Sequence, residues 1–86
     1  MDHVVRTPSQ LGKYLRALRQ ARGESQTVIA NRLGVSQARY SAMELRPEKM
    51  ATEKLLAVLA NLGVELVLRE KDEGGQSVPV HSEPEW

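Results

Sequence analysis

The chain has 86 residues, enough for one small domain with a modest hydrophobic core. It contains no cysteine, which excludes disulfides and thiolate metal sites. The two histidines, His3 and His81, lie near the chain ends, so we expect no metal site and no cofactor. Because the sequence shows neither a signal-peptide pattern nor a run of about 18 apolar residues, we expect a cytoplasmic protein without membrane contact.

The charge is divided along the chain although the net value is only +1. Residues 1–50 hold nine Lys and Arg against four acids, whereas residues 51–86 hold three against seven. A basic half beside an acidic half indicates a polyanion on one face and a different partner on the other. A mixed, solvated surface gives the same counts, so charge alone leaves both interpretations open.

A first helix is predicted after a short N-terminal arm of residues 1–7. Thr7 or Ser9 can cap it, Pro8 suits its first turn, and Gly23 ends it. Its apolar face recurs at helical spacing, at Leu11, Leu15 and Leu18. The polar residues expected largely outside that face are Lys13, Arg16, Arg19 and Gln20.

A second and a third short helix follow, separated by a tight turn at Gly34. The second is predicted from Ser25 or Gln26 to Leu33, with four inward residues: Val28, Ile29, Ala30 and Leu33. Ser36 can cap the third helix, in which Tyr40 and Met43 share the apolar face. Helix, tight turn and helix in this order are typical of the helix-turn-helix motif, whose second helix enters the DNA major groove.

The last helix is predicted after a break at Pro47, which disfavours helix at Arg46. Thr52 is its expected cap and Gly63 its end. Its apolar face is expected to comprise Leu55, Leu56, Val58, Leu59 and Leu62. The spacing of apolar residues then changes from helical to alternating, because Val64, Leu66 and Leu68 alternate with other side chains as in a half-buried strand. The sequence predicts no second strand with which this one could pair.

The remaining residues are rich in Gly, Pro, Ser and acids, and they predict a disordered tail that ends in the only tryptophan, Trp86. The predicted organisation is therefore an arm, a DNA-binding domain, a strand and a flexible tail, at residues 1–7, 8–63, 64–70 and 71–86.

Base contacts are predicted for the start of the third helix. The Gln37 amide can donate to and accept from an adenine edge, and the small Ala38 allows close approach or contact with a thymine methyl. Ser36, Arg39 and Ser41 complete the candidate base-reading set, with guanine or phosphate open for Arg39 and a base or phosphate open for Ser36. The alternative for each is a solvated surface residue.

Phosphate contacts are predicted for Gln26, which opens the second helix where free N–H groups favour an anion and which could also brace Gln37. Weaker phosphate candidates are Arg32, Lys13 and Arg46. Such contacts position a protein on DNA without specifying sequence.

Residues 8–62 resemble the Cro/repressor-type (XRE) helix-turn-helix family, through Gln26, Ala30, the run Leu33–Gln37, and Met43 followed by Glu44. The resemblance implies a mainly α fold of four or five helices. The single strand and the terminal Glu85-Trp86 make the whole chain similar to the HipB-like antitoxins within that family.

That narrower resemblance implies a homodimer whose strands pair across the two-fold axis, here through Val64, Leu66 and Leu68. It further implies repression at palindromic double-stranded operators and neutralisation of a HipA-like Ser/Thr kinase toxin, with Trp86 as a tail anchor in the toxin. The alternative is a stand-alone dimeric regulator of the same family without a toxin. An enzyme is disfavoured, because the sequence shows no nucleophile–base set or phosphate loop.

Overall fold

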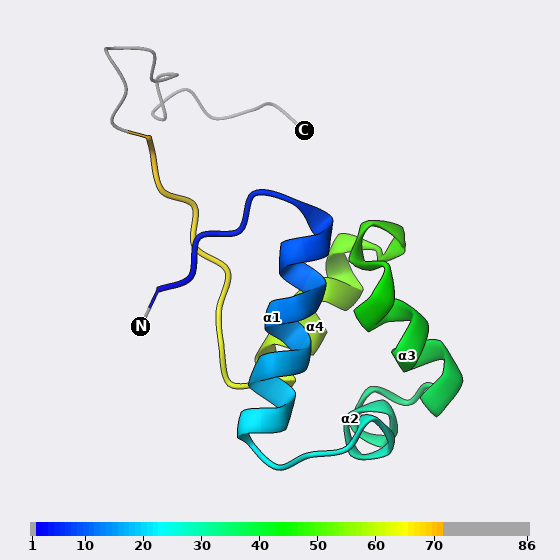
Figure 1. The fold of residues 1–86 in the computed structure, drawn as a ribbon. Coiled ribbons are helices and arrows are strands. Elements are labelled where there is room, and N and C mark those ends of the chain that lie inside the picture. Colours follow the sequence, from blue (N-terminus) through cyan, green and yellow to red (C-terminus); the bar gives the residue numbers. More distant parts are fainter. Residues whose placement is uncertain (1, 72–86) are drawn as a thin grey trace.

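A computed structural model describes residues 2–71 as a bundle of four helices (Figure 1). Trp86 and the rest of the predicted tail beyond residue 71 lie outside the described residues. The elements are α1 (Pro8–Ala21), α2 (Gln26–Leu33), α3 (Gln37–Leu45), η1, a short 3₁₀ turn (Pro47–Lys49), and α4 (Thr52–Asn61). α1 packs on α3 and on η1, while α2 packs on α3 and α4. None of the helices described is both long and apolar enough to cross a membrane.

Three of the helices begin at a side-chain hydroxyl: Thr7 for α1 and Ser36 for α3, as predicted, and Ser25 for α2, at the predicted start of that helix. Each hydroxyl oxygen accepts the backbone N–H three residues later at 3.1 to 3.2 Å, which satisfies one of the free donors of the first turn. The cap predicted at Thr52 is wrong. The Leu55 N–H donates to the Ala51 carbonyl at 3.0 Å, so α4 starts one residue earlier and Ala51 offers no capping side chain.

The turn between α2 and α3 depends on Gly34, which has a φ of 72°. The Gly34 N–H donates to the Asn31 carbonyl at 3.2 Å, and the Val35 N–H donates to the Ala30 carbonyl at 3.0 Å. These two bonds satisfy carbonyls that the end of α2 would otherwise leave free. The predicted turn is confirmed, and it delivers the chain directly into the Ser36 cap of α3.

The core lies where all four helices meet, and Tyr40 at its centre confirms the prediction for that residue. Three other predictions of burial are wrong: Val28 and Leu56 are exposed, and Arg19 is buried. Arg19 follows Leu15 by four residues, so it shares the inward face of α1 despite its charge. The buried apolar residues are Leu15, Ile29, Ala30, Tyr40, Met43, Val58, Leu59 and Leu62.

Gly12 lets α1 approach the end of α3 very closely. A Cβ at this position would lie 2.5 Å from the Glu44 carbonyl oxygen, well inside contact distance. The next nearest atoms belong to Pro47 of η1. The contact holds α3 against α1 at the residue whose side chain organises the site described below.

The strand predicted at residues 64–70 is not confirmed. The Val64 N–H donates to the Leu59 carbonyl at 3.0 Å and so closes α4, but residues 65–71 have no regular secondary structure. Leu66 and Leu68 are 54% and 91% exposed. A strand needs a hydrogen-bonded neighbour. In Figure 1 the segment runs beside the N-terminal arm, and no strand ladder forms among residues 2–71.

Candidate nucleic-acid interface

The first turn of α3 is presented to solvent. Ser36, Gln37, Ala38 and Arg39 are exposed, and Ser41 is half-buried. Tyr40 and Met43, on the opposite side of α3, are buried and attach the helix to the core. The structure therefore exposes four of the five predicted base-reading residues at the start of α3, with Ser41 half-buried one turn further along the helix.

Gln37 is held by a side chain from the preceding helix. Its Nε2 donates to the Gln26 Oε1 at 2.7 Å, and the two residues lie eleven positions apart at the starts of α3 and α2. The predicted bracing of Gln37 by Gln26 is thus present in the structure. Gln26 itself is half-buried, whereas Gln37 is exposed.

A buried ion pair lies behind this glutamine pair. The Arg19 guanidinium of α1 contacts both carboxylate oxygens of Glu44 in α3, with Nε 2.6 Å from Oε2 and Nη2 3.2 Å from Oε1. The third nitrogen, Nη1, donates to the Glu24 carbonyl at 3.0 Å. The Gln26 Nε2 also donates to the Glu44 Oε1, at 3.1 Å. Arg19, Glu44, Gln26 and Gln37 therefore form one continuous set of hydrogen bonds, the polar chain, from the core to the surface.

The charges in the polar chain stabilise each other. Burial by itself raises the pKa of Glu44, but the hydrogen bonds from Arg19 and then Gln26 outweigh it, and the pKa lies below the ordinary value. The hydrogen bond to Glu44 likewise raises the pKa of Arg19. Burial, and then the Glu44 charge, raise the pKa of Tyr40, whose hydroxyl lacks a well-aligned partner among the described residues. Glu44 therefore stays ionised inside the domain at neutral pH.

Two residues predicted to contact phosphate, Arg32 and Lys13, are not freely available beside the exposed start of α3. Arg32 is engaged by Glu24, with Nη2 2.5 Å from Oε2, and Arg22 contacts the other oxygen of the same carboxylate at 2.9 Å. Lys13 borders a shallow hollow with Val4 and Tyr14, by the N-terminal arm. Figure 1 shows that arm on the side of α1 away from α3. The structure thus does not bring Lys13 together with the exposed residues of α3.

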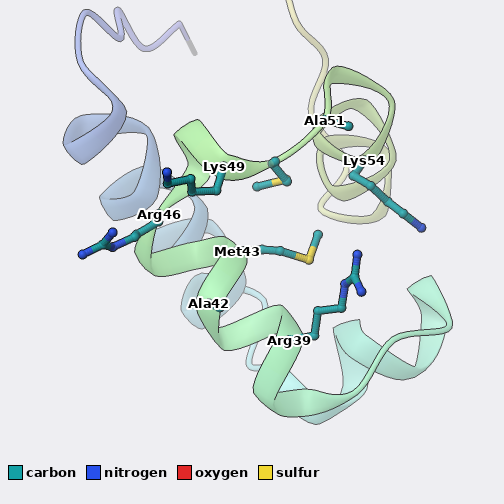
Figure 2. Close-up of a pocket in the computed structure, with 8 residues that line it drawn as sticks. Arg39, Ala42, Met43, Arg46, Lys49, Ala51 and Lys54 are labelled. Atoms are coloured by element: carbon teal, nitrogen blue, oxygen red, sulfur yellow. The ribbon is translucent and has the colours of Figure 1, made fainter.

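A basic groove runs between α3 and α4 (Figure 2). It has a volume of about 330 Å³, and Met43 and Met50 contribute apolar surface to it. In Figure 2, Arg39 from α3 and Lys54 from α4 project on the same side of Met43. Among residues 2–71, no acidic side chain lines the groove. Its four cationic side chains are Arg39, Arg46, Lys49 and Lys54.

Sequence reasoning missed Lys49 and Lys54 as members of this groove. The available signal was the series of basic residues around the Pro47 break, where Lys49 closes η1 and Lys54 lies in the first turn of α4. The start of α4 adds to the positive potential, because its Ala51 cap makes no side-chain hydrogen bond to the free N–H groups. All four cationic side chains line the groove near the start of α4, but in Figure 2 the charged ends of Arg46 and Lys49 project away from Arg39 and Lys54.

Comparison with known proteins agrees with this geometry. A family profile described as "Helix-turn-helix domain" matches residues 10–71, which is most of the chain. The protein belongs to this helix-turn-helix family. The matched residues include all of α2, α3 and α4, together with the Gln26 and Gln37 pair.

Within the helix-turn-helix family, the chain is similar to proteins named HipB. The chain is 23% identical over 82 residues to the protein named Antitoxin HipB of Escherichia coli O6:H1 (strain CFT073), covering 95% of this chain and 87% of that protein. A solved HipB–O1–O2 complex superposes with a TM-score of 0.73 at 25% identity, over 80% of this chain and 100% of that one. A HipA–HipB–O2–O3 complex gives 0.75 at 24% identity, over 83% and 100%. The protein is thus HipB-like in fold and sequence.

Proposed function

We propose that this protein is a sequence-specific DNA-binding repressor and the antitoxin of a HipA–HipB-type pair. The observation that carries the DNA-binding part is the exposed start of α3, with Gln37 held in place by Gln26 on a helix-turn-helix domain. The antitoxin part rests on the similarity to Antitoxin HipB along 95% of the chain. The protein acts by binding, not by catalysis.

Base recognition is assigned to α3. An amide such as that of Gln37 matches the N6 and N7 edge of adenine in the major groove. Ala38 leaves room for the helix to approach the bases, and Ser36 and Ser41 flank it. The Arg39 side chain lies at the basic groove, which favours phosphate over guanine as its contact.

The DNA backbone is assigned to the basic groove and to Gln26. Arg46, which was predicted from the sequence, is joined there by Lys49 and Lys54 beside the start of α4. Phosphate contacts release counterions, so the affinity for any DNA is expected to fall steeply with salt concentration. Arg32 takes part only if its ion pair with Glu24 opens.

Dimerisation is assigned to the segment after α4, through Val64, Leu66 and Leu68. Leu66 and Leu68 are exposed and Val64 is half-buried against the core, and a second copy of the segment would supply the missing hydrogen-bonded neighbour. A two-fold dimer presents two α3 helices, which fits a palindromic operator. The second partner is a HipA-like kinase toxin, since one solved relative is a complex of HipB with HipA, and Trp86 remains the proposed tail anchor.

The DNA-binding proposal is tested by Gln37→Ala on a duplex selected from a randomised pool by the unmodified protein. Loss of one bidentate base contact is expected to cost about 1–3 kcal/mol of binding free energy and to relax specificity at one base pair per half-site. Gln20→Ala is the matched control, because Gln20 is an exposed glutamine of α1 outside the interface. An equal loss on all sequences would reduce Gln37 to a phosphate contact.

The antitoxin proposal is tested by capture of the tagged full-length protein from its own cell lysate, followed by identification of bound protein and bound DNA. Recovery of a kinase-sized partner that is lost on truncation after Lys71 supports it. Recovery of operator DNA alone favours the alternative, a stand-alone dimeric regulator of the same family.

A further inference from the structure

We propose that Glu44 is a positioning residue for base recognition: its buried carboxylate determines how the oxygen and the nitrogen of the Gln37 amide are oriented toward DNA. The effect passes through the polar chain and needs no contact between Glu44 and DNA. It deepens the proposed function and rests on Gln37 being the base-reading residue.

The first step is the orientation of Gln26. An ionised carboxylate only accepts hydrogen bonds, and both Glu44 oxygens already accept from Arg19. The side chain of Glu44 is 1% exposed, so water does not satisfy it in place of protein donors. The atom that Gln26 turns toward Glu44 must therefore be its amide nitrogen, since the amide oxygen would meet an anion.

The second step carries this direction to the surface. With Nε2 of Gln26 bound to Glu44, Oε1 of Gln26 faces Gln37 and accepts from its Nε2 at 2.7 Å. An oxygen of Gln37 in that position would repel the oxygen of Gln26, so the direction of the second amide follows from the first. The polar chain thus transmits a donor–acceptor order from α1 through α3 and α2 to the exposed start of α3.

The third step is the consequence for DNA. Gln37 retains one N–H and its Oε1 for a base, the donor and acceptor that an adenine edge requires. An unlinked glutamine on an exposed helix turn would sample both amide orientations and several rotamers. Because the orientation is established before binding, less side-chain entropy is lost when the complex forms.

The test measures discrimination, defined as the ratio of dissociation constants for two duplexes. One is selected by the unmodified protein, and the other carries a purine without the N6 amino group at the adenine recognised through Gln37. Gln37→Ala is expected to lower this ratio about 2- to 12-fold, because the two duplexes differ by one hydrogen bond to Gln37. Glu44→Gln, which removes the acceptor-only anion, is expected to lower it by part of that factor, about 2- to 5-fold. Gln20→Ala should leave it unchanged.

A second variant covers the case in which Glu44→Gln does not fold. Gln26→Met keeps the Arg19–Glu44 ion pair and the approximate shape of the side chain while breaking the link to Gln37. It is also expected to lower discrimination about 2- to 5-fold. In addition, the side-chain amide signal of Gln37 in an NMR spectrum of the DNA-free protein should lose its hydrogen-bonded shift in both variants.

The outcomes separate this inference from the proposed function. If Gln37→Ala lowers discrimination but the folded Glu44→Gln and Gln26→Met proteins retain it, the positioning role is overturned and base reading stands. A uniform loss of affinity in Gln26→Met, with discrimination unchanged, likewise overturns positioning and leaves Gln26 as a phosphate contact. If Gln37→Ala itself leaves discrimination unchanged, the base-reading function of Gln37 is refuted first.

Discussion

The helix-turn-helix of α2 and α3 and the segment after α4 differ in where their partners lie. α2 and α3 satisfy their requirements within one chain: hydroxyl caps at their starts, a glycine turn between them, and Ile29, Ala30 and Tyr40 in the core. Residues 65–71 alternate like a strand but remain exposed, without regular structure. A helix closes its hydrogen bonds locally, whereas a strand depends on a neighbour. The same chain therefore contains a self-sufficient recognition unit and a segment suited to assembly.

The largest effect is expected when the recognition unit loses its internal anchor. Glu44→Ala leaves Arg19 buried and unpaired in the contact between α1 and α3, which should cost about 3–5 kcal/mol of unfolding free energy. Urea denaturation measures it. Glu24→Ala is the control, because its ion pairs with Arg22 and Arg32 lie nearer the surface and their loss should matter far less. Equal losses of unfolding free energy in both variants would mean that the buried ion pair stabilises the fold no more than the ion pairs of Glu24.

The next effect should appear in assembly rather than in folding. Leu66→Lys, on the alternating face of the extended segment, is expected to give a folded monomer and to weaken operator binding by about 100-fold or more, because the second half-site is no longer engaged together with the first. Sedimentation, circular dichroism and DNA titration measure the three properties. Val67→Lys, on the opposite face, should retain the dimer. An intact dimer in Leu66→Lys would refute dimerisation through this segment.

A smaller effect should distinguish two glycine turns of almost identical geometry. Gly34→Ala and Gly23→Ala each place a methyl group in open space at a φ of 72° or 70°, so only backbone strain is added, about 1–2 kcal/mol in each. Thermal unfolding should show equal destabilisation. DNA affinity should fall further in Gly34→Ala alone, because only that turn sets α3 relative to α2. Equal DNA affinities would show that the turn tolerates the change without moving α3.

The smallest effect is expected from acid. The pKa of Glu44 is lowered in the folded state, so its contribution to stability is complete above its ordinary value of 4.5 and is lost as the pH falls through the lower folded value. Denaturation between neutral pH and pH 3 should therefore show a decline that is shallower in Glu44→Gln. Parallel curves for the two proteins would assign the decline to other carboxylates.

Most of the fold followed from local signals in the sequence. Thr7, Ser25 and Ser36 cap helices and Gly34 makes a turn because capping and positive φ are properties of single residues and their nearest neighbours. The Gln26–Gln37 contact was also predictable, since both residues open helices of one recognisable motif. The errors at Val28, Leu56 and Thr52 arose where helix ends and facing neighbours, rather than periodicity, decide burial and capping.

The sequence by itself determined the helix-turn-helix and its exposed glutamine, because short-range hydrogen bonds and apolar spacing specify them. Only the tertiary structure decided that Arg19 is buried against Glu44, 25 residues away, and that Lys49 and Lys54 join Arg39 and Arg46 at one groove. Charges on different helices meet only after the core has set the distances between those helices. For the same reason the strand-like segment after α4 has no regular secondary structure in a single chain, since the neighbour that a strand needs is not supplied by nearby residues.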